Sequence, residues 1–385
     1  MTTQQSLCFR HVRSLVTFRT GAIALLSLLL LAPGCSDGDP KPKPDAQVQP
    51  DAAQQPDSAL QPDAQTSDAV VNPPDGTIGP DASAPQDPGE TGGETPTTWT
   101  EQVAVGSGGE ATTLTVTLHG PSSAGPHPVL IFTHGFQLAP SDYASYGQHL
   151  ASWGYVVIMP AMPGSAFSPT PHRVLKIYLR DLITWVETNG TTVGGPLQGK
   201  ADVSRLALAG HSMGGKISFL AATEDARPKG VFGVDPVDAA GGLGGPSADY
   251  PSVTPELMPQ ITVPIVSLGE TLNSTGGMMG QACAPAADNF QQYYQYATSP
   301  ALEVDVKNAN HMSFLDDPNC GFVCSACPAG TDDTAVTRRL TRRTLTAFLE
   351  VFLRQRPEHR YWLTGAGMTA DVTAGLLSIQ QKNNF

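Results

Sequence analysis

One serine lies in a glycine-rich segment, Gly210-His211-Ser212-Met213-Gly214-Gly215, between an apolar run and a stretch that we predict to be helical. A serine flanked by glycines between a strand and a helix is typical of a nucleophile elbow, whose tight turn lifts the hydroxyl above the edge of a sheet. The glycines remove side chains that would clash in such a turn. We therefore predict that Ser212 is a nucleophile; the alternative is a glycine-rich turn whose serine only caps the helix.

A nucleophilic serine needs a base to accept its proton, and in elbow enzymes a histidine follows the acid late in the chain. His311 comes directly after the predicted strand 302–306, and no other histidine lies between Ser212 and Arg356. His359 lies beyond the last predicted helix and is a poor candidate. We predict that His311 takes the proton of Ser212 and returns it to the leaving alcohol.

The acid that orients the histidine has three candidates. Asp235 directly follows the predicted strand 231–234, Asp238 is three residues further along the chain, and Glu270 ends the next strand. We favour Asp235, because an acid after this strand is one known arrangement; the competing interpretation is a turn-forming aspartate before a proline. Asp238 and Glu270 remain alternatives at this stage.

The segment His134-Gly135-Phe136 follows the predicted strand 128–133, where a second oxyanion donor is expected. We assign the backbone N–H groups of Phe136 and Met213 to the oxyanion hole, where each donor contributes roughly 3 kcal/mol to transition-state stabilisation. For His134 we favour a structural role in the loop over a catalytic one.

Short apolar runs alternate with helical periodicity after residue 100, which predicts a mostly parallel sheet with helices on both faces. Together with the elbow this predicts an α/β fold of the α/β-hydrolase class, with the chemistry beyond the carboxyl ends of the strands. The predicted strands are 102–105, 112–118, 128–133, 155–159, 206–209, 231–234, 264–268 and 302–306, and the predicted helices are 141–153, 173–188, 212–222 and 336–353.

The same residues resemble the chlorophyllase family over about 130 to 350. The shared pieces are 134–136, the elbow with Lys216, Gly233-Val234-Asp235-Pro236-Val237-Asp238, Cys283-Ala284-Pro285 and His311-Met312-Ser313-Phe314-Leu315-Asp316-Asp317. The resemblance implies hydrolysis of the phytyl ester of chlorophyll, with the aspartate of Val-Asp-Pro-Val as the acid, which supports Asp235. The elbow is also similar to bacterial cutinases and polyester hydrolases, so a polymer or lipid ester is an alternative substrate.

We therefore expect a serine carboxylesterase that forms an acyl-enzyme, needs no cofactor or metal, and acts as a monomer on a hydrophobic ester. Acyl transfer to another acceptor would use the same residues, and a non-catalytic surface binding module is an alternative from another class. The chain carries 22 Lys and Arg against 35 Asp and Glu. This acidic balance argues against nucleic acid as a partner, because phosphate binding needs a basic surface.

The first residues predict export. Three arginines precede the apolar run 21–32, which is too short to span a bilayer comfortably and ends at Ala32-Pro33-Gly34-Cys35. This resembles a bacterial lipobox, so we predict a signal peptide over 1–34, lipidation of Cys35 and anchoring to the outer membrane or cell surface of a bacterium. The alternative is an ordinary signal peptide with Cys35 incidental. The membrane is expected as a partner only through this anchor.

Composition divides the remaining chain. Residues 35–98 are dominated by small, polar and proline residues with a loose Pro-Asp-Ala repeat, and predict a disordered tether. We place the catalytic domain at 99–356 and a C-terminal tail at 357–385. The stretch 239–258 is rich in glycine and proline, and whether it forms a lid is left open.

Four cysteines remain outside the leader and the lipobox: Cys283, Cys320, Cys324 and Cys327. An even number in an exported domain predicts two disulfides, with three possible pairings. The spacing of the last three also matches an iron–sulfur motif, and a zinc site of all four is a further alternative.

Overall fold

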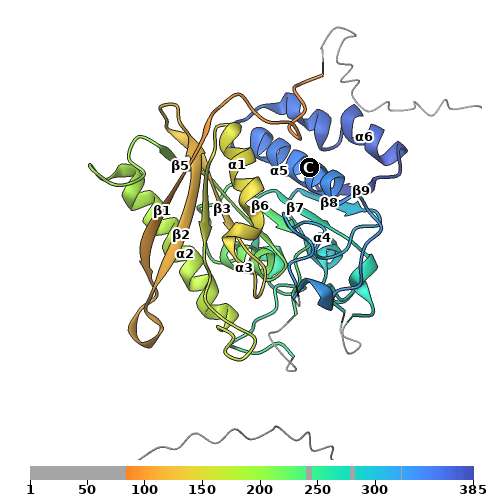
Figure 1. Cartoon of the computed structure of the whole chain (residues 1–385), viewed down its shortest axis with the longest axis horizontal. Coiled ribbons are helices and arrows are strands. Elements are labelled where there is room, and N and C mark those ends of the chain that lie inside the picture. The colour runs from red at the N-terminus through yellow and green to blue at the C-terminus, as the bar shows by residue number, and fades with distance from the viewer. Residues whose placement is uncertain (1–83, 240–244, 278–281, 322) are drawn as a thin grey trace, which may run out of the picture. The chain divides into compact units, whose positions relative to one another are not determined.

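The computed structural model describes residues 84–239, 245–277, 282–321 and 323–385. The predicted signal peptide, Cys35 and most of the predicted tether lie outside the described residues. In the described part the strands form a nine-stranded sheet in the order β1-β2-β4-β3-β5-β6-β7-β8-β9 (Figure 1). The strands are β1 (Pro96–Val105), β2 (Thr112–Pro121), β3 (His127–Thr133), β4 (Val156–Pro160), β5 (Ala201–His211), β6 (Val231–Val234), β7 (Ile265–Gly269), β8 (Ala301–Val306) and β9 (Leu377–Lys382).

The pairing from β4 through β3, β5, β6 and β7 to β8 is parallel throughout. Antiparallel strands complete the sheet at both ends, where β1 and β2 join β4 and where β9 joins β8. The continuous apolar runs of the inner strands suit this arrangement, because parallel strands are covered on both faces. The predicted α/β-hydrolase fold with a mostly parallel sheet is confirmed.

Two hydrophobic cores cover the two faces of the sheet. Successive strand residues point to opposite faces, so Val129 and Ile131 belong to one core while Leu130 and Phe132 belong to the other. The first core includes residues of α2 (His172–Thr191), α3 (Met213–Ala222) and α4 (Phe290–Tyr296). The second includes residues of α1 (Ala144–Ser152), α5 (Thr334–Phe352) and α6 (Ala366–Thr373).

The predicted start of the domain at residue 99 is wrong. Strand β1 begins at Pro96, and the residues before it already pack on the domain. The indole of Trp362 donates to the carbonyl of Pro85 at 3.3 Å, that of Trp153 donates to Glu90 at 2.8 Å, and Asp87 pairs with Arg339. These contacts use backbone carbonyls and charged side chains, which a composition argument based on apolar burial does not detect.

The predicted C-terminal tail is also wrong for residues 357–385. They form the 3-10 helix η7 (Pro357–Trp362), α6 and β9, and β9 pairs with β8 along its whole length. The last residue, Phe385, is buried and stacks on Phe348 of α5 at 6.4 Å between ring centroids. The C-terminus therefore closes one end of the sheet.

The four cysteines of the domain form two disulfides, Cys283–Cys327 and Cys320–Cys324. The prediction of two disulfides therefore agrees with the structure. With all four sulfur atoms in disulfides, none of these cysteines is a free thiol for the alternative iron–sulfur or zinc site. Among the residues that the structure describes, no helix is long and apolar enough to cross a bilayer.

Candidate active site

Ser212 occupies a strained turn between β5 and α3, with φ 55° and ψ −121°. Neighbouring glycines make this turn possible. A Cβ on Gly210 would lie 2.4 Å from the carbonyl carbon of Gly214, and one on Gly214 would lie 2.1 Å from the carbonyl oxygen of Thr133. Both distances are far shorter than van der Waals contact, so neither position can carry a side chain in this turn. This agrees with the prediction that the turn requires glycine at both positions.

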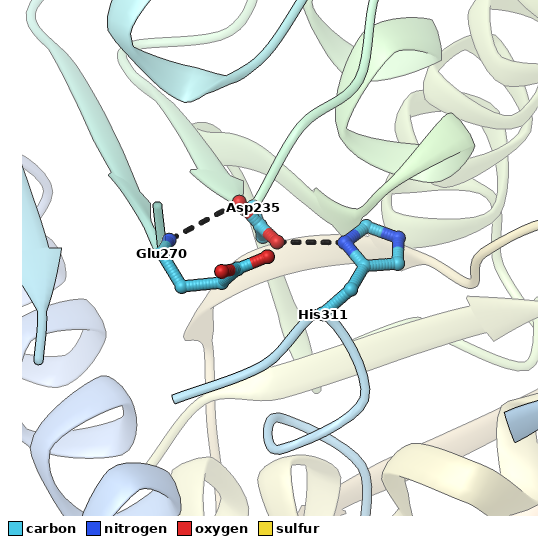
Figure 2. A group of neighbouring side chains, drawn as sticks. All are labelled: Asp235, Glu270 and His311. Carbon is cyan, nitrogen blue, oxygen red and sulfur yellow. Dashed lines mark hydrogen bonds and ion pairs between the residues drawn. The ribbon is translucent and has the colours of Figure 1, made fainter. Parts of the chain in front are cut away.

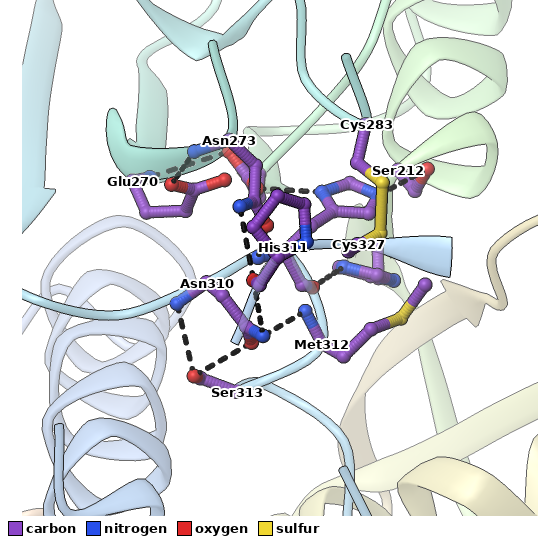
Figure 3. The surroundings of a disulfide bond; sticks show 12 residues. Ser212, Glu270, Asn273, Cys283, Asn310, His311, Met312, Ser313 and Cys327 are labelled. Atoms are coloured by element: carbon purple, nitrogen blue, oxygen red, sulfur yellow. Dashed lines mark hydrogen bonds and ion pairs between the residues drawn. A yellow bond between two sulfur atoms is a disulfide. The ribbon is translucent and has the colours of Figure 1, made fainter. Parts of the chain in front are cut away.

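The three residues predicted to act together do lie together. The Nδ1 atom of His311 is 2.6 Å from Oδ2 of Asp235 (Figure 2). Its Nε2 atom is 2.9 Å from Oγ of Ser212 (Figure 3). An ionised carboxylate can only accept hydrogen bonds, so Nδ1 carries the ring proton and Nε2 is free to accept the proton of the serine. The residues come from the carboxyl ends of β5, β6 and β8, where a parallel sheet gathers its chemistry.

The other two acid candidates have different surroundings. The carboxylate of Asp238 accepts hydrogen bonds from the backbone of Val253 and Thr254 and lies 3.2 Å from the ammonium of Lys216, with both of these charged side chains fully buried. Glu270 lies beside Asp235, to which its backbone N–H donates at 3.3 Å (Figure 2). Asp235 is the carboxylate that contacts the ring of His311.

His134 fixes the backbone of residues 134–136, which we call the oxyanion loop after its predicted role, and this agrees with the structural role predicted for this histidine. Its Nδ1 donates to the carbonyl of Gly135 at 2.8 Å, and its Nε2 accepts from the backbone of Met162 at 2.9 Å. The two predicted oxyanion donors, Phe136 and Met213, border the same cavity as Ser212. Their position agrees with a role in stabilising an oxyanion formed at the serine.

A cavity of about 180 Å³ opens beside the serine. Its walls come from the oxyanion loop, the segment after β4, the start of α2, the elbow and the segment after β6. Apart from Ser212, most of the lining is apolar: Phe136, Pro163, Pro169, Thr170, His172, Leu175, Met213, Val237 and Ala239. Of the possible lid at 239–258, Ala239 contributes to the wall, and residues 240–244 lie outside the described part of the chain.

A strained serine, its histidine and a buried aspartate beside an apolar cavity are found here in a chain that matches the chlorophyllase family over residues 93–369. The chain belongs to the chlorophyllase family. This confirms the resemblance seen in the sequence, and the membership indicates a hydrolase that acts on esters.

Plant proteins of this family are similar to the chain at low identity. Chlorophyllase-2 of Arabidopsis thaliana is 25% identical over 244 residues, which are 60% of this chain and 76% of the relative. Chlorophyllase-1 of the same plant is 27% identical over 210 residues, covering 53% of this chain and 64% of the relative. Chlorophyllase type 0 of Chenopodium album is 25% identical over 273 residues, covering 63% and 72%.

In this chlorophyllase-family chain Asp235 lies next to a second buried carboxyl group, that of Glu270. Burial and the neighbouring charge of Asp235 raise the pKa of Glu270 to about 9. Burial also raises the pKa of Asp235, but the hydrogen bond from His311 opposes that shift. Glu270 therefore holds a proton near neutral pH, so Asp235 has no second charged carboxylate beside it.

The donor atoms of Asp235, Glu270 and His311 lie within 4.8 Å of one another, close enough to surround a metal ion. A metal there would compete with the Nδ1 proton of His311 for Asp235 and with the proton of Glu270. The three side chains therefore fit a protonated Glu270 beside a hydrogen-bonded Asp235–His311 pair better than they fit a bound metal ion.

Glu270→Gln is expected to stabilise the protein increasingly as pH rises. The unfolded chain releases the Glu270 proton near 4.5 and the folded protein near 9, so the folded state binds the extra proton between these values. Wild-type stability must then fall as pH rises through this window. A neutral amide removes this loss, and we expect the gain to grow by a few kcal/mol, about 2 or more, between the two limits.

Urea denaturation of both proteins near pH 5 and near pH 9 measures this difference. Glu256→Gln is the matched control, because Glu256 is an exposed glutamate of the same domain. A gain that is the same at both pH values would contradict a proton held on Glu270.

A buried tyrosine, Tyr143, and the histidine of the elbow, His211, connect Gly135 to the backbone of His311 by hydrogen bonds. The backbone N–H of Gly135 donates to the Tyr143 hydroxyl at 3.3 Å, which donates to Nδ1 of His211 at 2.7 Å. Nε2 of His211 then donates to the carbonyl of His311 at 2.9 Å. Burial lowers the pKa of His211 far below its usual value, so the ring stays neutral and each nitrogen keeps one role. The sequence did not predict this series of hydrogen bonds.

Tyr143→Phe is expected to lower kcat about tenfold with little change in KM. Without the hydroxyl, Nδ1 of His211 and the N–H of Gly135 lose their partner, and the loops that carry the oxyanion donors and the base lose a shared support. Ester hydrolysis at saturating and limiting substrate separates the two constants.

Tyr155→Phe is the matched control, because its hydroxyl also makes a buried 2.7 Å hydrogen bond, to Glu350, away from Ser212. Equal losses of kcat in both variants would show that only general stability is affected.

Proposed function

We propose that this protein is a serine carboxylesterase with Ser212 as nucleophile, His311 as base and Asp235 as the acid that orients it. The observation that carries the proposal is the continuous hydrogen-bonded series from Ser212 through His311 to the fully buried Asp235, with distances of 2.9 and 2.6 Å. Ser212 lies in a strained turn between β5 and α3, which is the position of the nucleophile in the α/β-hydrolase fold.

In the first half of the reaction, Oγ of Ser212 attacks the ester carbonyl while His311 takes its proton. The negative oxygen of the tetrahedral intermediate accepts from the N–H groups of Phe136 and Met213. The intermediate then collapses as His311 gives its proton to the leaving alcohol, which leaves an acyl-serine.

In the second half, water attacks the acyl group and gives one proton to His311. Collapse of the second intermediate breaks the bond to Ser212, which regains its proton from His311, and the carboxylic acid leaves. Asp235 accepts from Nδ1 throughout, so the imidazolium formed in each half is paired with a charge.

The apolar lining of the cavity favours a hydrophobic ester as substrate. The plant relatives are named chlorophyllases, so the phytyl ester of chlorophyll is one candidate, and lipid or polymer esters are others.

The test is hydrolysis of p-nitrophenyl esters of increasing chain length, together with labelling by a fluorophosphonate. We expect turnover, a preference for longer acyl chains, and label on the peptide that contains Ser212. Labelling with transfer of the acyl group to added alcohols would indicate an acyltransferase. Folded protein that neither turns over esters nor takes the label would support a binding module.

We also propose that the protein is exported and held at a bacterial membrane by a lipid on Cys35. The support is the sequence 32–35 at the end of a short apolar run behind three arginines. Cys35→Ala is expected to move the protein from the membrane fraction to the soluble fraction on cell fractionation, because the lipid supplies the anchor. Ser36→Ala, which keeps the cysteine, is the control; a Cys35→Ala protein that remains with membranes would contradict the anchor.

A further inference from the structure

The wall of the cavity contains a histidine that the proposed reaction does not use. His172, the first residue of α2, borders the cavity together with Ser212 and is only 6% exposed. Its Nδ1 atom is buried without a hydrogen-bond partner, and among the described residues neither ring nitrogen makes a hydrogen bond. Buried polar groups without partners are rare and costly, so this imidazole requires an explanation.

The surroundings of His172 keep its ring neutral. Burial is the main cause and the nearby cation of Lys216 adds to it, so that the pKa of His172 falls to about 3. The Tyr250 ring meets the imidazole edge-on, with 5.0 Å between centroids, and makes an apolar contact. A neutral imidazole offers one N–H donor and one acceptor nitrogen, and it has no charge that would attract a carboxylate.

The neighbours of His172 in the cavity wall do not offer it a polar partner. Leu175, Pro169 and Val237 are apolar, and the hydroxyl of Thr170 makes no hydrogen bond to the imidazole in the described part of the chain. Because the protein encloses Nδ1, the ring nitrogen that a group entering the cavity with the substrate can reach is Nε2, which makes no hydrogen bond within the described residues.

We propose that His172 is a specificity-determining residue that hydrogen-bonds a second oxygen function of the substrate, so that the preferred substrate is a hydrophobic ester carrying a further carbonyl or ether oxygen. The inference rests on the proposed esterase function, because it needs the ester to be bound at Ser212. The inference also narrows the expected substrate class. A simple alkyl ester has no second oxygen function, so it would leave the imidazole of His172 without a hydrogen-bond partner.

The experiment compares a straight-chain fatty acyl p-nitrophenyl ester with analogues of the same length that carry one ketone oxygen at successive carbons. Wild-type protein is expected to hydrolyse at least one ketone analogue with a kcat/KM about tenfold above that of the alkyl ester, which one hydrogen bond can supply. In His172→Phe, which keeps a ring but has no polar atom, this ratio is expected to fall to about one or below.

Thr170→Val is the matched control, because it removes the other polar side chain of the wall besides the nucleophile, and it is expected to keep the ratio. His172→Asn, which restores a small donor and acceptor, is expected to recover part of the ratio and also serves if the phenylalanine variant does not fold. A wild-type ratio near one for every analogue, or a ratio that survives in both His172 variants, would overturn the proposal. Turnover of the alkyl ester that depends on Ser212 reports on the esterase function separately.

Discussion

Ser212→Ala is expected to lower kcat for p-nitrophenyl butyrate by on the order of 10⁶, the scale seen when an enzyme with a Ser-His-Asp triad loses its nucleophile. Without Oγ no acyl-enzyme forms, and His311 has no proton to accept from the protein. The measurement is initial rate against substrate concentration, with far-UV circular dichroism to show that the variant is folded.

Ser218→Ala is the matched control for this loss. Ser218 lies on α3, the helix that begins directly after Ser212. It is fully buried and donates to the carbonyls of Ala209 and Gly214, so its removal costs hydrogen bonds but not the nucleophile. We expect Ser218→Ala to keep activity within a few-fold and to keep fluorophosphonate labelling. Ester hydrolysis that survives in Ser212→Ala would place the nucleophile elsewhere.

Asp235→Asn is expected to lower kcat by on the order of 10⁴ while the fold is kept. An amide in place of the carboxylate can donate to Nδ1, which moves the ring proton to Nε2 and leaves no acceptor for the proton of Ser212. It also removes the charge that stabilises the imidazolium. The pH–rate profile of the residual activity shows whether the base still titrates as in the wild type.

The two other carboxyl groups of the region are controls with separate expectations. Asp238→Asn leaves the buried Lys216 without its counter-charge, so we expect a loss of stability of about 3 kcal/mol or more with kcat of the folded fraction largely kept. Glu270→Gln replaces one neutral group by another, and we expect kcat near pH 7 to change little. A loss in Glu270→Gln as large as that in Asp235→Asn would contradict our assignment of the acid.

The sequence predicts the centre of the sheet well, because β3, β4 and β6 consist mostly of apolar residues, which is typical of strands in a parallel sheet that is covered on both faces. The margins of the domain are predicted poorly. Residues 84–95 have too few apolar side chains for a composition argument to see, yet their carbonyls and Asp87 bind the domain. Strand β9 pairs with the edge of β8, and its Leu377 belongs to the second core.

The site shows the same division. Ser212 and His311 follow from local pattern and chain order, and Asp235 from its place after a strand. Tyr143 and His211 were missed because their contact joins residues 68 positions apart, and no motif links them. No sequence pattern identifies His172 either, because it is an isolated histidine at the start of a helix. Only the structure shows that it borders the same cavity as Ser212.

The path of residues 84–94 has a practical consequence for immobilisation. Gly92 and Glu94 bond Ser152, at the end of α1 and therefore near the amino end of β4, whereas Ser212 follows the carboxyl end of β5. Residues 92–94 therefore lie near the amino ends of the strands, whereas Ser212 lies beyond their carboxyl ends. Protein coupled to a bead or a sensor surface through its N-terminal side should keep the cavity facing the solution, which suits assays on bulky or insoluble esters.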